Sequence, residues 1–357
     1  MKVVIFAGGV GTRLWPLSRK NSPKQFGKII GDKSTLQQAV DRLQPEFKPE
    51  DIYVATGKRY SDIVVSQLPK IPKNNFIFEP EMRDVGPAIG LVTAILNKKY
   101  PNEPMAIIWS DHMVRDIPVF QKALRTAEKS IAEGKSDFVF IGQKPRFANQ
   151  NVGWIQCGDE IAEEKGLKIL EFKKLKYRPK LSQAEDFFEN EHYVWNLGYF
   201  VTTPSFLIEK FEKYTPQMYE DLNKIIGSGD FDKSLSEIYP RLEKISFDDA
   251  ILEKFSQSKI SVISVDIGWS DIGAWEALKE ALSENADENV TKGKVMVEDS
   301  RDSLVFNYTN QLTVGIDLEE MLVINTEDVV LVCPKSSVPK IKKLVESLAG
   351  TPHEHLT

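Results

Sequence analysis

The chain opens with a short apolar run that leads into a glycine-rich turn, Val3-Val4-Ile5-Phe6-Ala7-Gly8-Gly9-Val10-Gly11-Thr12-Arg13-Leu14. Residues 3–6 predict a strand, and glycines that follow a first parallel strand let backbone N–H groups approach a phosphate closely. The spacing is not that of a dinucleotide-binding turn, because Leu14 stands where the third glycine would be, and no Gly-Lys-Ser/Thr follows as in a P-loop. Neither a dinucleotide fold nor a P-loop NTPase is therefore favoured.

Positive charge gathers around this turn. The whole chain carries a net charge of −6, yet its first 31 residues hold six bases and no acid. Arg13 lies in the turn and Lys24 follows it, while Pro16 and Pro23 stiffen the segment between them. A rigid loop that offers N–H donors, a guanidinium and an ammonium group suits a polyphosphate. A solvated basic loop is the alternative interpretation.

Strand-like and helix-like segments alternate beyond the turn. Apolar runs at 52–55, 76–78, 105–109 and 138–141 predict strands, and helical spacing at 34–43, 60–68, 86–99 and 117–133 predicts helices. This alternation predicts βαβ units with helices on both faces of a sheet. Continuously apolar strands are typical of a sheet covered on both faces. We therefore predict an α/β, Rossmann-like domain with a mostly parallel, mixed sheet.

The second half of the chain is less regular and then changes character. It contains predicted strands at 153–158, 168–172, 193–202 and 260–265, and predicted helices at 204–213, 232–238, 248–256 and 274–282. After a polar stretch at 284–292, short β-type segments follow at 294–297, 304–306, 312–316, 321–324 and 329–332, with a helix at 338–348. We predict a first domain over 1–285 and a small β-rich, β-helix-like domain over 286–357, without a strong internal repeat.

Composition excludes several classes of protein. With 357 residues, 41% hydrophobic and 27% charged, the chain is expected to be globular and not disordered. Its acidic total disfavours a nucleic-acid binder, and no run reaches the roughly 18 apolar residues of a membrane span. The N-terminal apolar run is too short for a signal peptide. Two isolated cysteines, Cys157 and Cys333, indicate a reducing, cytoplasmic setting.

Several longer motifs extend the pattern of the first turn. They are Trp15-Pro16-Leu17-Ser18-Arg19, Pro23-Lys24-Gln25-Phe26, the run from Glu79 to Ile89, Ser110-Asp111-His112, Trp195-Asn196-Leu197-Gly198-Tyr199-Phe200, the run from Ser246 to Lys254, the run from Gly268 to Trp275, and the run from Leu322 to Asp328. In this order they resemble the mannose-1-phosphate guanylyltransferase family of sugar-nucleotide pyrophosphorylases over nearly the whole chain. The resemblance implies attack by a sugar-1-phosphate on the α-phosphorus of a nucleoside triphosphate, with GTP and mannose-1-phosphate as substrates and GDP-mannose and pyrophosphate as products.

The resemblance also assigns expected roles to individual residues. Catalytic roles fall to Arg13, Lys24, Asp111 and Asp271; nucleotide binding to Gly8, Gly9, Gly11, Thr12, Arg13, Glu79, Arg83, Asp84 and Pro87; and sugar binding to Gly153, Arg178, Asn196, Gly198 and Asp248. His112 is expected to orient Asp111 or to satisfy a core hydrogen bond, because an anionic phosphate nucleophile needs no base.

A magnesium site is expected at the two aspartates. Asp111 follows the 105–109 strand and Asp271 follows the 260–265 strand, and ligands gather at the carboxyl ends of parallel strands. Mg²⁺ prefers oxygen ligands and is commonly held by one or two carboxylates plus phosphates. The alternatives are a turn residue for Asp111 and a helix N-cap for Asp271.

Two segments depart from the family pattern. Asp84-Val85-Gly86 stands where the family has Asn-Thr-Ala, and Tyr177-Arg178 aligns with a Glu-Lys pair. These changes leave open another base or sugar, and also a non-catalytic sugar-nucleotide-binding subunit, although such a subunit would be expected to lose the phosphate and metal residues. A dehydrogenase is disfavoured by the missing third glycine. Because the chain ends at Thr357, we expect no appended isomerase domain, and the β-rich domain is the candidate for self-association.

Overall fold

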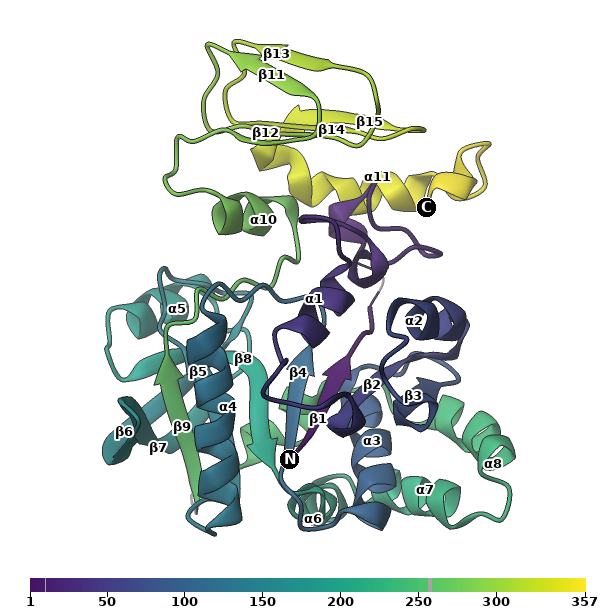
Figure 1. The fold of residues 1–357 in the computed structure, drawn as a ribbon, viewed down its shortest axis with the longest axis vertical. Helices are drawn as coiled ribbons and strands as arrows, with labels where there is room; N and C mark the ends of the chain where they lie inside the picture. Colours follow the sequence, from purple (N-terminus) through teal and green to yellow (C-terminus); the bar gives the residue numbers. More distant parts are fainter. Residues whose placement is uncertain (10, 256–258) are drawn as a thin grey trace. The chain divides into compact units, whose positions relative to one another are not determined.

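The computed structural model describes residues 1–9, 11–255 and 259–357, and Figure 1 traces the fold. The chain divides into two compact units. The first comprises Met1–Gly8, Val40–Trp109 and Arg115–Ile267, and the second comprises Gly9–Ala39, Ser110–Val114 and Gly268–Thr357. The glycine-rich loop therefore belongs to the same unit as the C-terminal strands, although the two are far apart in the sequence.

The first unit is built on a nine-stranded mixed sheet with the order β3-β2-β1-β4-β8-β5-β9-β7-β6. Its strands are β1 (Lys2–Phe6), β2 (Ile52–Gly57), β3 (Phe76–Glu79), β4 (Met105–Trp109), β5 (Phe138–Gln143), β6 (Gly153–Glu164), β7 (Leu167–Lys176), β8 (Tyr193–Thr202) and β9 (Ile260–Val265). β1 pairs in parallel with β2 and β4, whereas β8 runs antiparallel to β4, β5 and β6. The predicted α/β fold with a mixed sheet is confirmed. Because β7 is also antiparallel to β6 and β9, the expected predominance of parallel pairs is not found among the described strands of this sheet.

Helices cover both faces of this sheet. They are α2 (Ser61–Gln67), α3 (Val85–Lys99), α4 (Ile117–Ala132), α5 (Leu181–Phe188), α6 (Pro204–Tyr214), α7 (Pro216–Gly227), α8 (Phe231–Ile238) and α9 (Phe247–Ala250). Phe120 of α4 contacts Tyr199 of β8, with ring centroids 5.7 Å apart. The next residue, Phe200, points to the opposite face, because side chains alternate along a strand. There it stacks on Phe247 of α9 at 5.4 Å.

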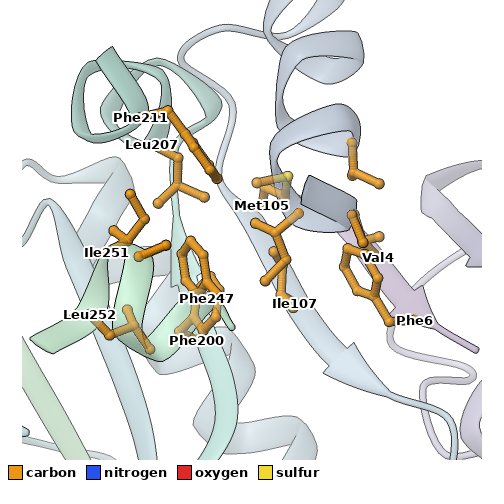
Figure 2. Close-up of a cluster of buried hydrophobic side chains, with 14 of the residues drawn as sticks. Val4, Phe6, Met105, Ile107, Phe200, Leu207, Phe211, Phe247, Ile251 and Leu252 are labelled. Carbon is orange, nitrogen blue, oxygen red and sulfur yellow. The ribbon is translucent and has the colours of Figure 1, made fainter. Parts of the chain in front are cut away.

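The main core lies on the face of the sheet that carries Phe200. Figure 2 shows Val4 and Phe6 of β1 and Met105 and Ile107 of β4 beside Phe200, and Leu207 and Phe211 of α6 with Phe247, Ile251 and Leu252 in the same cluster. All of these side chains are buried. Full burial of each large apolar side chain contributes roughly 1.5–3 kcal/mol. This packing fixes α9, the short helix that carries Asp248.

The second unit contains two small sheets whose strands form stacked coils. The sheets are β10-β12-β14-β15 and β11-β13, and the strands are β10 (Val290–Lys292), β11 (Val295–Glu298), β12 (Leu304–Asn307), β13 (Thr313–Ile316), β14 (Met321–Asn325) and β15 (Val330–Pro334). Val295 pairs with Thr313 and Leu304 with Leu322 in parallel register. The predicted β-rich C-terminal region is confirmed.

The parallel pairing reveals an 18-residue repeat. Among the described residues, four hydrogen bonds join side chains to positions 18 residues away, one of them Asn325 Nδ2 to Asn307 Oδ1 at 3.2 Å. The repeat is structural, so it does not contradict the expectation that the sequence lacks a strong internal repeat. Few residues are identical between the two coils, Asn307 and Asn325 being one such pair, so the repeat is carried by backbone geometry and burial.

The N-terminal loop shares a hydrophobic cluster with these strands. Leu14, Trp15 and Ile29 pack with Ile272 and with a set of buried residues from the C-terminal part: Trp275, Leu278, Val290, Leu304, Phe306, Leu322, Ile324, Leu331, Val338, Ile341 and Val345. In Figure 1 the start of the loop lies beside α11 (Ile341–Ser347). Two further helices complete the unit's elements, α10 (Trp275–Leu282) and α1 (Thr35–Asp41), the latter ending in the first unit.

Some predicted element bounds change in the structure. The predicted helix at 248–256 is α9 followed by a 3₁₀ turn at Leu252–Lys254, and residue 256 lies outside the described residues. The predicted helix at 338–348 is a 3₁₀ turn, Lys335–Lys340, followed by α11. Among the described helices, none has the length and apolar character needed to cross a membrane.

Candidate active site

The glycine-rich loop leaves β1 in a conformation that glycine favours. Gly9 and Gly11 have φ angles of +93° and +63°, which lie in the left-handed region. A Cβ atom on Gly11 would lie 2.9 Å from both Lys24 Cγ and Ser18 Oγ, so glycine lets the turn lie against these residues. Gly8 has open space around its Cα. Thr12 begins a 3₁₀ turn, and its side chain lies outside the described part of the chain.

Lys24 is a buried cation that connects separate parts of the second unit. Its side chain and backbone together are 7% exposed. Its backbone N–H donates to Ser18 Oγ at 3.0 Å, and its Nζ lies 2.8 Å from Asp111 Oδ2 and donates to the Ile272 carbonyl at 3.3 Å. Burial raises the pKa of Asp111, but the charges of Lys24 and His112 and the hydrogen bonds to the carboxylate together outweigh burial, and the pKa of Asp111 falls below its usual range. The Asp111 carboxylate is therefore ionised at neutral pH.

A short antiparallel bridge brings the two predicted metal ligands together. Met113 N donates to Ser270 O at 2.8 Å and Ser270 N donates to Met113 O at 3.1 Å. In this register Asp111 lies opposite Ile272, and the residue after it lies opposite Asp271. Asp111 and Asp271 therefore lie on facing segments of one compact unit, one register position apart.

Arg13 joins the same cluster. A Cβ atom placed on Gly273 would lie 3.1 Å from Arg13 Nη2 and 3.1 Å from Asp271 Oδ2, so both groups lie beside this glycine. The Gly273 N–H also donates to Asp271 Oδ1 at 3.4 Å. The four predicted catalytic side chains, Arg13, Lys24, Asp111 and Asp271, therefore surround one small region.

Backbone strain is concentrated at the residue between Asp271 and Gly273. Ile272 has a φ of +36°, which is rare for a β-branched residue and costs about 1–3 kcal/mol. The side chain is 3% exposed and packs in the hydrophobic cluster of the second unit. In this conformation the Ile272 carbonyl accepts the hydrogen bond from Lys24 Nζ. Strain of this kind is typical of functional sites.

His112 makes a hydrogen bond that leaves Nδ1 as an acceptor. Trp269 Nε1 donates to His112 Nδ1 at 3.0 Å, and the two rings meet edge to face with centroids 5.0 Å apart. An acceptor nitrogen carries no proton. This is the core hydrogen bond that the sequence analysis expected of His112.

The chemistry of the cluster suits magnesium. Asp111 and Asp271 supply hard carboxylate oxygens, and Mg²⁺ is usually held by one or two carboxylates together with phosphates and water. Among the described residues, no group of three or more His, Cys, Asp and Glu side chains comes together, so a closed, protein-only metal cage is not formed there.

A second group of predicted residues meets in the first unit. Asn196 of β8 pairs with Gly153 of β6, and a Cβ atom on Gly153 would lie 3.1 Å from Asn196 Cβ. Asn196 Nδ2 donates to Asp248 Oδ1 at 3.1 Å, and Asn196 Oδ1 accepts from the Gly198 N–H at 3.0 Å. Gly198 has a φ of +68°, and a Cβ there would lie 2.4 Å from Trp109 Nε1.

Asp248 lies in a polar, partly charged setting. Burial raises the pKa of Asp248 to about 6, and the positive charge of Arg178 acts against that rise. The Arg178 guanidinium lies 5.0 Å from the centre of the Tyr177 ring. Burial raises the pKa of Tyr177, and the charge of Asp248 adds to the rise. Arg178 therefore acts electrostatically on Asp248, and Asp248 acts on Tyr177, the other residue of this pair that departs from the family pattern.

The predicted base-binding segment is placed at the end of β3 and the start of α3. Glu79 is 8% exposed, and its Oε2 accepts a hydrogen bond from Tyr239 Oη at 2.6 Å. Arg83 Nη2 lies 3.7 Å from Glu81 Oε2, so Arg83 pairs with Glu81 and not with Glu79, whose partner is Tyr239. Asp84, with a φ of +70°, caps α3 by accepting from the Val85 N–H at 2.7 Å.

Comparisons with known proteins identify the family. The "Nucleotidyl transferase" family matches residues 2–288, and the "MannoseP isomerase/GMP-like beta-helix domain" matches residues 293–348. A mannose-1-phosphate guanylyltransferase of Escherichia coli is 31% identical over 97% of this chain and 75% of its own length, and one of Salmonella muenchen is 32% identical over 99% and 74%. The chain belongs to the mannose-1-phosphate guanylyltransferase family.

A solved structure supports this membership. It comes from Thermus thermophilus and is described as a mannose-1-phosphate geranyltransferase. It superposes with a TM-score of 0.86 at 27% identity and covers 97% of this chain and 98% of its own. The chain is therefore a nucleotidyltransferase with a β-helix domain. The predicted domain boundary after residue 285 stays a prediction.

This guanylyltransferase-family chain has Gly86 where the family's Asn-Thr-Ala segment has alanine, and the structure gives a steric reason for the glycine. Gly86 N donates to the Ile245 carbonyl at 3.0 Å, and a Cβ atom on Gly86 would lie only 2.7 Å from that oxygen. Glycine therefore lets the first turn of α3 approach the segment that leads to Asp248. Pro87 follows in the same turn and is buried.

Sequence reasoning missed three contributors. Tyr239 fixes Glu79, Ser18 fixes the backbone of Lys24, and the Ile272 carbonyl receives the Lys24 ammonium group. Ser18 and Ile272 lie inside motifs quoted in the sequence analysis, so their place in the sequence could have marked them as site residues. Tyr239 lies outside every motif, and no feature of the sequence singled it out.

Proposed function

We propose that the protein transfers GMP from GTP to mannose-1-phosphate, giving GDP-mannose and pyrophosphate. The observation that carries this proposal is the cluster of Arg13, Lys24, Asp111 and Asp271, which combines two cations for phosphates with two carboxylates for a metal. Family membership supports the same chemistry. A non-catalytic subunit would not need this combination.

The reaction requires little covalent chemistry from the protein. An oxygen of the sugar phosphate attacks the α-phosphorus, a new P–O bond forms, the α–β phosphoanhydride bond breaks, and pyrophosphate leaves with the electron pair. The attacking oxygen is already anionic, so no general base is needed, in keeping with a His112 whose Nδ1 accepts from Trp269. Placement and charge neutralisation supply the rate enhancement of such a step.

Each residue of the cluster has a distinct task in the proposal. Arg13 binds triphosphate oxygens through its guanidinium fork. Lys24 neutralises charge on the phosphates, and its ammonium group is aimed by Asp111 and by the Ile272 carbonyl. Asp111 and Asp271 would hold Mg²⁺, which supplies further neutralisation of the phosphate charge when bound. The backbone of Gly8, Gly9 and Gly11, with Thr12, lies against the nucleotide.

The first unit supplies sugar and base recognition in the proposal. Asn196, the Gly198 and Gly153 backbone, and Asp248 bind sugar hydroxyls, and Arg178 binds the sugar phosphate. Guanine presents N1–H and N2–H₂ donors beside an O6 acceptor, which Arg83, Asp84 and Pro87 together with Glu79 would read. Glu79 is buried against Tyr239, whereas Arg83 is half-buried and Asp84 is exposed, so the base contacts of this segment rest mainly on Arg83 and Asp84.

The setting of the reaction is part of the same proposal. We propose a cytoplasmic protein that binds neither nucleic acid nor membrane and that self-associates through the β-rich region. The free cysteines Cys157 and Cys333 accord with a cytoplasmic setting, and the acidic net charge accords with the absence of nucleic-acid binding.

The decisive experiment measures pyrophosphate release with a panel of nucleoside triphosphates and sugar-1-phosphates, in Mg²⁺ or EDTA. The variants are Asp111→Asn and Asp271→Asn, and the control is Asp299→Asn, an exposed acid at a φ of +48° that asparagine tolerates. Wild type and control should release pyrophosphate with GTP and mannose-1-phosphate in Mg²⁺ only. Each site variant should lose activity by about 100-fold or more.

Other outcomes would change the proposal in defined ways. Release with a different substrate pair would keep nucleotidyl transfer and assign the changes at Tyr177 and Asp84–Gly86 to specificity. Binding of a sugar nucleotide without release from any pair would overturn catalysis in favour of a binding subunit.

A further inference from the structure

The motif Trp15-Pro16-Leu17-Ser18-Arg19 directly follows the glycine-rich turn, yet its side chains contact the C-terminal part of the chain. Trp15 is buried, and its Nε1 donates to the Leu356 carbonyl at 2.8 Å. The Trp15 carbonyl accepts from Trp275 Nε1 at 3.1 Å. All of these residues belong to the second compact unit. The segment between Arg13 and Lys24 is therefore anchored by the C-terminal part.

The strongest polar anchor is a two-pronged ion pair. Arg19 Nη1 donates to Asp328 Oδ2 at 2.6 Å and Nη2 donates to Asp328 Oδ1 at 2.7 Å. Arg19 Nε donates to the Pro16 carbonyl at 3.0 Å. Parallel Arg–carboxylate hydrogen bonds are among the strongest and most direction-specific in proteins.

Asp328 is itself held in place. It lies in the turn between β14 and β15, where Asp328 Oδ1 accepts from Thr326 Oγ1 at 3.1 Å. Thr326 and Val329 close the turn with hydrogen bonds of 2.9 Å and 3.1 Å. The hydrogen bond from Arg19 lowers the pKa of Asp328 to about 2, so this carboxylate stays charged across the working pH range.

From Arg19 the contacts lead directly to Lys24. Arg19 and Ser22 exchange backbone hydrogen bonds of 3.0 Å and 3.1 Å and so close a small hairpin. Ser18, which precedes the hairpin, accepts from the Lys24 N–H, which follows it. The ion pair therefore holds the base of the hairpin whose two ends carry Ser18 and Lys24.

We infer that Arg19 and Asp328 are a positioning pair through which the C-terminal strands hold Lys24 in place for the phosphates of the nucleoside triphosphate. Neither residue touches the reacting groups in this account, because both act through the hairpin. The inference rests on the proposed function, since it takes Lys24 as a phosphate-binding residue. It gives the β-helix domain an indirect part in nucleotide binding, through the hairpin and Lys24.

A plain surface ion pair is the competing explanation. Exposed pairs contribute about 0–1 kcal/mol to stability and do not change substrate binding. Arg301 and Glu319 form such a pair between segments that connect the C-terminal strands, and both side chains are more than half exposed. This pair does not involve the loop, so Glu319→Gln is a matched control for Asp328→Asn.

The test compares steady-state kinetics of wild type, Asp328→Asn, Arg19→Lys and Glu319→Gln, with Mg²⁺ and the best substrate pair. For Asp328→Asn and Arg19→Lys we expect the KM for the nucleoside triphosphate to rise about 5- to 10-fold. This rise corresponds to a loss of about 1 kcal/mol or slightly more of binding free energy, because Lys24 is no longer held in place. The KM for the sugar-1-phosphate should change less than twofold. Glu319→Gln should match wild type in both constants.

Exchanging the two charges shows whether the effect comes from the ion pair or from each residue alone. Arg19→Asp combined with Asp328→Arg should recover at least part of the nucleoside triphosphate KM that each single exchange loses. If Asp328→Asn does not fold, Arg19→Lys, which keeps the charge and loses the fork, decides the question. Equal constants for Asp328→Asn and Glu319→Gln, or absence of any recovery in the exchanged pair, would overturn the inference.

The inference and the proposed function fail differently. If wild type releases no pyrophosphate with any pair, the proposed function fails, and the positioning role is then measured by the Kd of Mg²⁺–GTP in titration calorimetry. A weaker Kd for Asp328→Asn than for Glu319→Gln would still support it, and equal values or an absence of GTP binding would overturn it. If wild type is active and the nucleotide KM is unchanged in Asp328→Asn, only the inference fails.

Discussion

Two carboxyl groups, the buried Glu79 and the half-buried Asp248, resist ionisation in the folded protein. Burial raises the pKa of Glu79 to about 7, although the hydrogen bond from Tyr239 acts against the rise, and burial raises the pKa of Asp248 to about 6. A carboxyl group whose pKa is higher in the folded state binds more protons there than in the unfolded chain. The unfolding free energy that such a group contributes is therefore present at low pH and is lost as the pH rises through its pKa in the folded state.

Glu79→Gln should remove the larger part of this pH dependence. The ordinary pKa of Glu79 is 4.5, so between about pH 4.5 and 7 the wild type should lose up to about 3 kcal/mol of unfolding free energy from this group. Glutamine is neutral throughout and keeps an oxygen that accepts from Tyr239 Oη. Urea unfolding at pH 5 and pH 8 should show a smaller difference for Glu79→Gln than for wild type or for Glu237→Gln, an exposed control on α8. Identical differences in all three proteins would contradict a raised pKa at Glu79.

At the same scale, the sequence predicted the strands that place two of the candidate site residues. Asp111 follows β4 directly, and Asn196 lies on a strand whose predicted bounds, 193–202, match those of β8. The partners of these residues were harder to predict. Lys24 contacts the carbonyl of Ile272, 248 positions away, and a backbone carbonyl leaves no signature in a sequence. The pairing of Glu79 with Tyr239 likewise depends on how the chain returns after α8.

At the scale of elements, the start of α3 and the segment before α9 form one junction. The Gly86 N–H donates to the Ile245 carbonyl, and Tyr239 Oη reaches Glu79 at the end of β3. Both contacts hold the segment between residues 239 and 246, which leads into the helix with Asp248. The position of Asp248 beside Asn196 therefore depends on contacts made by another part of the sheet edge.

Gly86→Ala tests this junction. The added Cβ would lie 2.7 Å from the Ile245 carbonyl oxygen, so the segment before Asp248 must move. We expect a loss of about 1–3 kcal/mol in unfolding free energy and a rise of several-fold in the KM for the sugar-1-phosphate. Gly227→Ala is the control, because nothing lies within 4 Å of its added Cβ. If Gly86→Ala binds the sugar-1-phosphate as wild type does, the junction does not position Asp248.

Element prediction worked best where apolar runs were long and bounded by turns. The strand predicted at 260–265 agrees with β9, whereas α5 and α7 were not predicted and α9 is shorter than expected. α9 spans four residues because Ile251, its C-cap, turns out of the helix with a φ of −131° and packs in the core. The 18-residue coil was missed for a related reason. Its stacking is fixed by backbone pairing and by asparagines such as Asn307 and Asn325, and not by a repeated sequence.

At the scale of the whole molecule, the compact units do not follow the order of the sequence. Residues 9–39 belong with the C-terminal strands, and Leu14 and Trp15 are part of the cluster that contains Leu304 and Ile324. Residues that share one hydrophobic cluster tend to open as one cooperative unit. The phosphate loop should therefore share its stability with the C-terminal strands, although family matching divides the chain between residues 288 and 293.

Ile324→Ala should reveal this coupling in amide hydrogen exchange. Ile324 is fully buried, and its truncation should cost about 2–5 kcal/mol, because a cavity remains in the cluster. Exchange should accelerate at residues 14–18 and in β12 and β14 together, while β5 and β8 keep their protection. Val262→Ala, a buried truncation in the core of the first unit, should give the reverse pattern. If Ile324→Ala speeds exchange only in the C-terminal strands, the loop opens independently of them. The shared cluster then does not couple the stability of Leu14 and Trp15 to that of the strands.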